Sequence, residues 1–169
     1  MRPVSPTKRR IALSSLVILL FGFSAQMEAQ VYGTSSHTVT VTVATINVVQ
    51  VSSGSVSLSI IGAGVPAGQD QMTAVDQTTN LLWGVNSSTK KITVSTNLAA
   101  PTFTLNVLAL NPTQGTAAPE VTLSTVATDF LLNIGRSSGT CTLRYTGIAL
   151  ASQGMGTDTH TITFTVATQ

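Results

Sequence analysis

The stretch that decides the fold is Thr157-Asp158-Thr159-His160-Thr161-Ile162-Thr163-Phe164-Thr165-Val166. Apolar or aromatic side chains at the even positions from 160 to 166 alternate with threonines at the odd positions. Successive residues of a β-strand point to opposite faces, so this stretch predicts a strand with one apolar face and one hydroxyl face. A helix would instead repeat its apolar residues at intervals of three and four.

The same alternation recurs along most of the chain, between segments rich in Gly, Ser, Asn and Pro. Residues 127–134 fit either a helical turn or a buried strand. Short strands with turns roughly every 8–12 residues are typical of β-sandwiches, so the sequence predicts an all-β fold, a single antiparallel sandwich of about eight strands. The expected strands are at residues 38–51, 56–60, 81–85, 91–96, 103–107, 121–123, 141–145 and 157–166. The expected core includes Val41, Leu58, Ile92, Leu105, Leu143, Ile162 and Phe164.

Two connections follow from breaks in this pattern. Residues 38–51 carry valines at three odd positions, followed by Ile46 and Val48 at even positions. This change of phase near residue 44 predicts a β-bulge or a strand that crosses between sheets. Residues 86–90, Asn-Ser-Ser-Thr-Lys, are expected to form a hairpin turn.

The beginning of the chain has the order of a secretory signal peptide. Four basic residues between Arg2 and Arg10 precede an apolar run from Ile11 to Ala25, and small and polar residues follow. This run is shorter than the ~20 apolar residues of a membrane span, although an uncleaved anchor is an alternative. We expect removal of residues 1–29, with cleavage after Ala25 as the other option. The domain of residues 30–169 would then be secreted, to the periplasm or the bacterial cell surface, with no remaining membrane span.

Charge argues against a nucleic-acid partner. Without residues 1–29 the chain keeps four basic and five acidic residues, a net charge of −1, so the basic excess belongs to the leader. Binding to nucleic acid requires a basic patch that replaces phosphate counterions, and four scattered cations do not supply one.

The residue types that carry catalysis or hold metals are scarce. Zinc needs three or four Cys, His or carboxylate ligands, and the chain has one cysteine and two histidines. Cys141 shares its parity with Leu143 and Tyr145, so we expect a buried, inert thiol rather than a nucleophile activated by His160. An exposed Cys141 would instead favour an intermolecular disulfide. We expect no enzyme activity and no cofactor, and we expect the only tryptophan, Trp83, to lie in the core rather than in a glycan site.

A turn-rich passage from residue 62 to residue 70 contains three glycines and a proline. It is expected to open a loop that reaches Thr79, with a short helical turn at residues 71–75. Calcium prefers clustered oxygen ligands, but two acids in this loop without close spacing are more simply solvated. The candidate binding residues of the loop are Gly64, Gly68, Asp70 and Asp76.

A second candidate site is a strand edge near the beginning of the expected domain. Its residues are uncharged and include no proline, so they lack the usual protection against pairing with other chains. Either the segment is buried centrally in its own domain, the simpler expectation, or it is donated to a neighbouring chain by β-augmentation. The segment consists of Thr38, Val39, Thr40, Val41, Thr42 and Val43.

The ending Gly154-Met155-Gly156-Thr157-Asp158-Thr159-His160-Thr161-Ile162-Thr163-Phe164-Thr165-Val166 resembles that of spore coat protein U and related fimbrial-like secreted domains. In those domains a Gly-rich turn and a Thr-Asp pair lead into a Thr/Val strand. Residues 37–43, His-Thr-Val-Thr-Val-Thr-Val, and 90–94, Lys-Lys-Ile-Thr-Val, are similar to bacterial surface domains of this kind. The resemblance implies an Ig-like sandwich, exported to the cell surface or assembled into a fibre.

Composition, export and resemblance together favour a non-enzymatic surface, matrix or fibre-forming structural protein. Its partners would be other copies of itself or other surface proteins. The alternative is a secreted, monomeric module that binds a ligand or a glycan through the loop at residues 62–79.

Overall fold

The computed structural model describes residues 34–61 and 67–169 of the chain. The leader predicted at residues 1–29 and the predicted loop residue Gly64 lie outside this part. The chain divides into two units, Met1–Val41 and Thr42–Gln169. Every strand assigned to the described residues belongs to the second unit.

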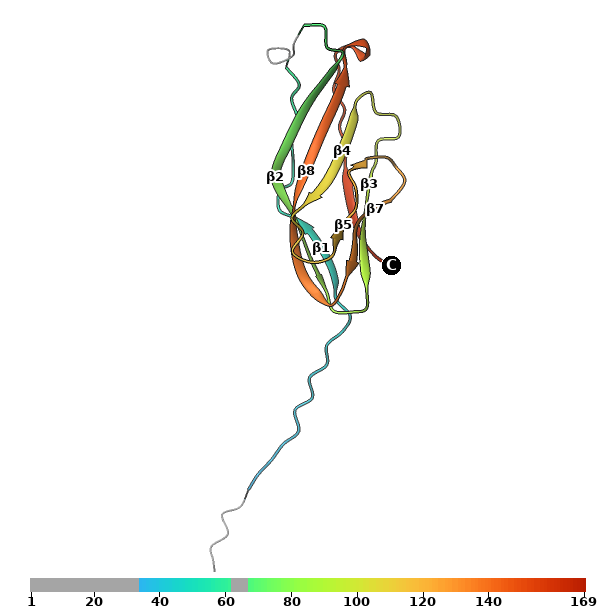
Figure 1. The fold of residues 1–169 in the computed structure, drawn as a ribbon. Coiled ribbons are helices and arrows are strands. Elements are labelled where there is room, and N and C mark those ends of the chain that lie inside the picture. The colour runs from blue at the N-terminus through green and yellow to red at the C-terminus, as the bar shows by residue number, and fades with distance from the viewer. Residues whose placement is uncertain (1–33, 62–66) are drawn as a thin grey trace, which may run out of the picture. The chain divides into compact units, whose positions relative to one another are not determined.

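The unit Thr42–Gln169 is built from two antiparallel sheets (Figure 1). The first sheet has the order β1-β2-β8-β4-β6 and the second has the order β5-β7-β3-β9. The only helical turn in the described residues is the 3-10 turn η3 (Ala151–Gln153). The prediction of an all-β, antiparallel fold is therefore confirmed. The strands are β1 (Asn47–Val51), β2 (Gln71–Val85), β3 (Lys90–Thr96), β4 (Thr104–Leu110), β5 (Thr116–Ala117), β6 (Val121–Thr122), β7 (Thr128–Ile134), β8 (Ser137–Leu150) and β9 (Ile162–Thr168).

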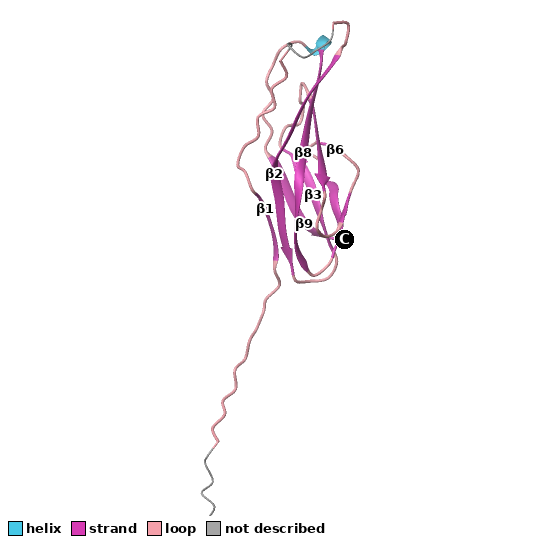
Figure 2. Cartoon of the chain, turned by 60° about the vertical axis from the view of Figure 1, so that its left-hand side comes forward, coloured by secondary structure: helices cyan, strands magenta, loops and turns pink. Residues whose placement is uncertain are grey.

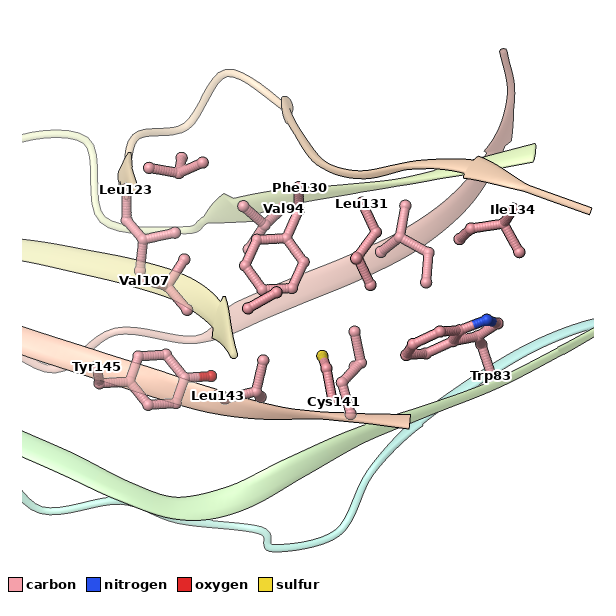
Figure 3. Packing of buried hydrophobic residues seen from close by; sticks show 14 of the residues in the cluster. Trp83, Val94, Val107, Leu123, Phe130, Leu131, Ile134, Cys141, Leu143 and Tyr145 are labelled. Atoms are coloured by element: carbon pink, nitrogen blue, oxygen red, sulfur yellow. The ribbon is translucent and has the colours of Figure 1, made fainter. Parts of the chain in front are cut away.

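One apolar core joins the two sheets in a sandwich-like arrangement (Figure 3). Phe130 and Leu131 of the second sheet face Cys141, Leu143 and Tyr145 of the first. Of the predicted core residues, Ile92 and Leu143 are completely buried. The others, except Val41, are partly buried against this core: Leu58, Leu105, Ile162 and Phe164.

The predicted loop to Thr79 and its helical turn are wrong, because residues 71–85 form the single long strand β2. β2 pairs with β8 from Gln71↔Leu150 to Val85↔Ser137, and the register shifts between Asp76 and Thr79. The carboxylate of Asp76 accepts hydrogen bonds from the backbone N–H of Thr78 at 3.0 Å and from its hydroxyl. The inward-facing residues of β2 have even numbers before this bulge and odd numbers after it. A single alternating pattern therefore does not run through the strand, and the sequence does not reveal its full length.

The beginning of the sandwich also departs from the prediction. β1 starts only at Asn47, and residues 34–46 belong to no strand. Val49 and Val51 face the core, and the register from Asn47↔Val85 to Val51↔Leu81 is uninterrupted. The bulge or crossing predicted near residue 44 is wrong, because residues 34–46 pair with no strand. Ile46 and Val48 are exposed, at 45% and 56%. Residues 56–60 likewise form no strand.

The connections between the strands differ from the hairpin pattern. Residues 86–89 join β2 of the first sheet to β3 of the second, so the predicted hairpin is wrong and the turn is a crossing between sheets. Residues 135–136 make a similar crossing from β7 to β8. The ambiguous segment at residues 127–134 is a strand, since Phe130, Leu131 and Ile134 of β7 are buried.

Gly139 allows the indole of Trp83 to pack directly on the backbone of β8. Trp83 is opposite Gly139 in the register, and a Cβ added at Gly139 would lie 2.4 Å from the nearest indole carbon. We expect Gly139→Ala to lower the free energy of unfolding by roughly 1–3 kcal/mol, as overpacking does. Gly135→Ala is the control, because a Cβ there meets nothing within 4 Å. Equal urea midpoints for the two variants would contradict this packing.

Candidate functional site

The segment Thr38–Val43 has the composition of a strand but the exposure of an unpaired chain. Val39, Val41 and Val43 are 71%, 81% and 70% exposed. Alternating valine and threonine favour a pleated, half-buried environment. The simpler expectation of central burial is therefore wrong, as is the assignment of Val41 to the core. Of the two outcomes, donation to another chain is the one that still agrees with these exposed valines.

The sandwich offers two long strands at its edges, β1 in the first sheet and β9 in the second. The opposite edges, β6 and β5, contain two residues each. β9 pairs with β3 from Thr96↔Ile162 to Lys90↔Thr168, and in the described residues no strand pairs with its other side. Its sequence, Ile-Thr-Phe-Thr-Val-Ala-Thr, contains no lysine, no other charge and no proline. β9 therefore lacks the features that usually prevent a strand edge from pairing.

The edge strands β1 and β9 come near each other across the sandwich (Figure 2). Ile92 and Val94 of the central strand β3 are 0% and 1% exposed. The inward side chains of the two edge strands pack on the same core but are only partly buried. We call this set the β1–β9 edge; it comprises Val49, Val51, Ile162, Phe164 and Val166.

The structure does not assemble the predicted binding loop. Gly68 lies in a turn with φ of +88°, and Asp70 comes directly before β2. Asp76 lies within β2, six residues further along, a separation of roughly 20 Å in an extended chain. Within residues 34–61 and 67–169, no group of three or more His, Cys, Asp or Glu side chains could hold a metal ion.

The Cys141 and His160 side chains have separate, structural surroundings. Cys141 is 2% exposed, as predicted, and burial raises the pKa of its thiol to about 11. Very little of the reactive thiolate is present near neutral pH when the thiol pKa is so high. His160 is half-buried, and its Nδ1 lies 3.1 Å from the Thr96 hydroxyl.

Trp83 offers no platform for a sugar, because it is only 3% exposed and packs on Gly139. A shallow groove of about 390 Å³ passes beside it. None of the six residues that line this groove is charged, and its only ring is the buried indole. These residues are Leu82, Trp83, Thr113, Ser138, Gly139 and Thr140.

The sequence marks the segment Thr38–Val43 as able to pair, but it does not show that β9 is an edge strand. The sequence does show that residues 162–168 could pair at an edge, since they contain neither charge nor proline. Strand order was the missing information: the alternation in residues 157–166 is the same for a central strand and for an edge strand.

No family model, curated protein or solved structure matches the chain. In the part of the chain that the structure describes, no helix is long and apolar enough to cross a membrane.

Burial of Cys141 and Tyr145 should make the sandwich sensitive to alkaline pH. Burial raises the pKa of Cys141 from 9.0 to about 11, and burial with a smaller contribution from Asp76 raises that of Tyr145 from 10.0 to about 12. The unfolded chain therefore loses these protons first, and stability present below pH 9 falls as the pH rises toward 11.

We expect Cys141→Ala to lose less stability than the wild-type chain between pH 8 and pH 10.5, measured by urea titration at each pH. The comparison uses the change with pH, so a constant cost of the substitution cancels. Parallel losses in both proteins would show that the thiol does not contribute.

Proposed function

We propose that this chain is a non-enzymatic, exported structural protein of a cell surface, matrix or fibre, whose copies associate by β-augmentation. The segment Thr38–Val43 of one copy is the donated strand, and the β1–β9 edge of the next copy receives it alongside β9. The observation that carries the proposal is the exposure of Val39, Val41 and Val43, at 71%, 81% and 70%, in a sequence of strand-forming alternation.

The segment Thr38–Val43 and the β1–β9 edge match each other in their apolar side chains, and both are uncharged. A strand beside β9 would extend the second sheet, and its valine face would cover Phe164 and Val166, which their own sandwich leaves partly exposed. Neither Thr38–Val43 nor β9 contains a charged residue, so their pairing requires no charge to lose its water.

The expected strength of the contact is moderate. Complete burial of three valines contributes roughly 4–9 kcal/mol, and each new backbone hydrogen bond adds about 0.5–1.5 kcal/mol. Association costs roughly 4–15 kcal/mol in lost freedom of motion. Gain and cost are of similar size, so association should depend on concentration.

The acceptor is a second copy rather than the chain's own β9. To reach its own edge strand, the segment would have to reverse direction before β1. Tight reversals use Gly, Pro, Asn or Asp, and residues 38–46 contain none of these.

Export is supported by the basic residues and the apolar run at the start of the sequence, which fall outside the described residues. The resemblance to spore coat protein U and fimbrial-like domains supports an Ig-like arrangement of the sandwich and a place on the cell surface. The ligand-binding alternative is weakened, since its candidate residue Asp76 lies in the strand β2 and not in a loop.

We expect Val41→Lys to weaken association at least about tenfold, because it places a charge in the interface. Thr40→Lys is the matched control: it adds the same charge at the neighbouring position, on the opposite face of the segment. Both side chains are exposed, so neither substitution should change the urea midpoint. Light scattering after size exclusion, at several concentrations, measures the association.

Two results would overturn the proposal. A wild-type chain that stays monomeric at the highest concentration would favour the monomeric module. Equal effects of Val41→Lys and Thr40→Lys would show that charge, and not the valine face, controls association.

A further inference from the structure

We infer that Asn86 positions the segment Thr38–Val43, because its side chain fixes the point at which the chain leaves the sandwich. Asn86 directly follows Val85, the last residue of β2. It is bound to the residues before β1, which themselves belong to no strand. The inference rests on the proposed function only for its consequence in assembly.

Asn86 makes three hydrogen bonds to two residues. The backbone N–H of Ile46 donates to Oδ1 of Asn86 at 2.6 Å. Nδ2 of Asn86 donates to the carbonyl of Ala44 at 2.7 Å. The backbone N–H of Asn86 donates to the carbonyl of Ile46 at 3.1 Å. We call these three bonds the Asn86 clamp.

The clamp extends the ladder of β1 beyond its last backbone pair, Asn47↔Val85. A side-chain amide carries one acceptor and two donors, so it can replace a peptide group at the end of a strand. One amide thereby holds the chain as far as Ala44, although residues 34–48 are all exposed. An aspartate at this position would keep the acceptor for Ile46 but lose the donor to Ala44.

The clamp also holds the residues that connect the segment Thr38–Val43 to β1. Val49 and Val51 face the core, and the β1 register is unbroken. If the chain stays extended through residues 44–46, Val43 and the two valines before it keep the same parity. Without the clamp, residues 44–46 would be free as well. Ile46 could then also pair with an acceptor strand. Because it lies on the face opposite to the three valines of the segment, the segment could pair in a shifted register.

The turn sequence Asn86-Ser87-Ser88 also fits an N-glycosylation site. A glycan would be attached to Nδ2, the atom that donates to Ala44. The clamp therefore gives the triplet a structural role.

The test is amide hydrogen exchange at Ile46 in the full chain, at a concentration low enough to keep it monomeric. We expect Asn86→Ala to speed exchange of the Ile46 amide about tenfold, as loss of its hydrogen-bond acceptor permits local opening. Asn86→Gln, which retains an amide on a longer side chain, should restore part of the protection. Ser87→Ala is the control: its hydroxyl donates to Oδ1 of Asn47 at 3.2 Å, in the same turn.

Unchanged exchange at Ile46 in Asn86→Ala, or equally fast exchange in Ser87→Ala, would overturn the inference. Association is measured separately, and Asn86→Ala should weaken it several-fold while the β2–β8 amides stay protected. A wild-type chain that does not associate would refute the proposed function, whereas the exchange result would still decide whether Asn86 holds the chain.

Discussion

The antiparallel pairing of β2 with β8 is the interaction on which the rest of the sandwich depends. These strands run together along the middle of the first sheet and support β1 on one side and β4 on the other. Their inward side chains, including Leu81, Trp83, Cys141 and Leu143, belong to the core. The bulge between Asp76 and Thr79 changes which residues of β2 face inward. Even-numbered residues face inward before it and odd-numbered residues after it.

Alternation of apolar and polar residues predicted the strands that contain no bulge of their own. The end of β2 and the strands β3, β4 and β8 follow the alternation in the sequence, and Ile92 and Leu143 are buried as expected. The first half of β2 was missed because its bulge breaks the period, and because the glycines before it suggested a loop. Alternation reports which face a residue takes, but it does not report whether a partner strand is present. Residues 38–46 therefore look the same in sequence as a paired strand.

Only one part of the candidate site, the segment Thr38–Val43, could be predicted from the sequence, because alternation does not report which strands are neighbours. Lack of charge and proline marked Thr38–Val43 as a segment able to pair, and its exposure rules out central burial in its own domain. The edge of β9 required the strand order, and the Asn86 clamp required a contact forty residues apart in sequence. Neither is encoded in a local pattern. By contrast, Gly68, Asp70 and Asp76 were chosen by composition, and Asp76 lies within the strand β2, away from the other two.

Donor and acceptor in the proposed contact are different surfaces of the same chain, which sets the kind of assembly that can form. A twofold dimer needs one surface that is complementary to itself, whereas a segment that fits an edge makes a head-to-tail contact. Each added copy uses one segment and one edge and leaves one of each free at the ends. Such contacts close into a ring only if the rotation between copies returns to the start, and otherwise they continue as a fibre. The Asn86 clamp bears on this choice, because it leaves few residues between the donated strand and its own sandwich. A short, extended connection fixes the rotation from copy to copy, so the geometry at Ala44 would decide between ring and fibre.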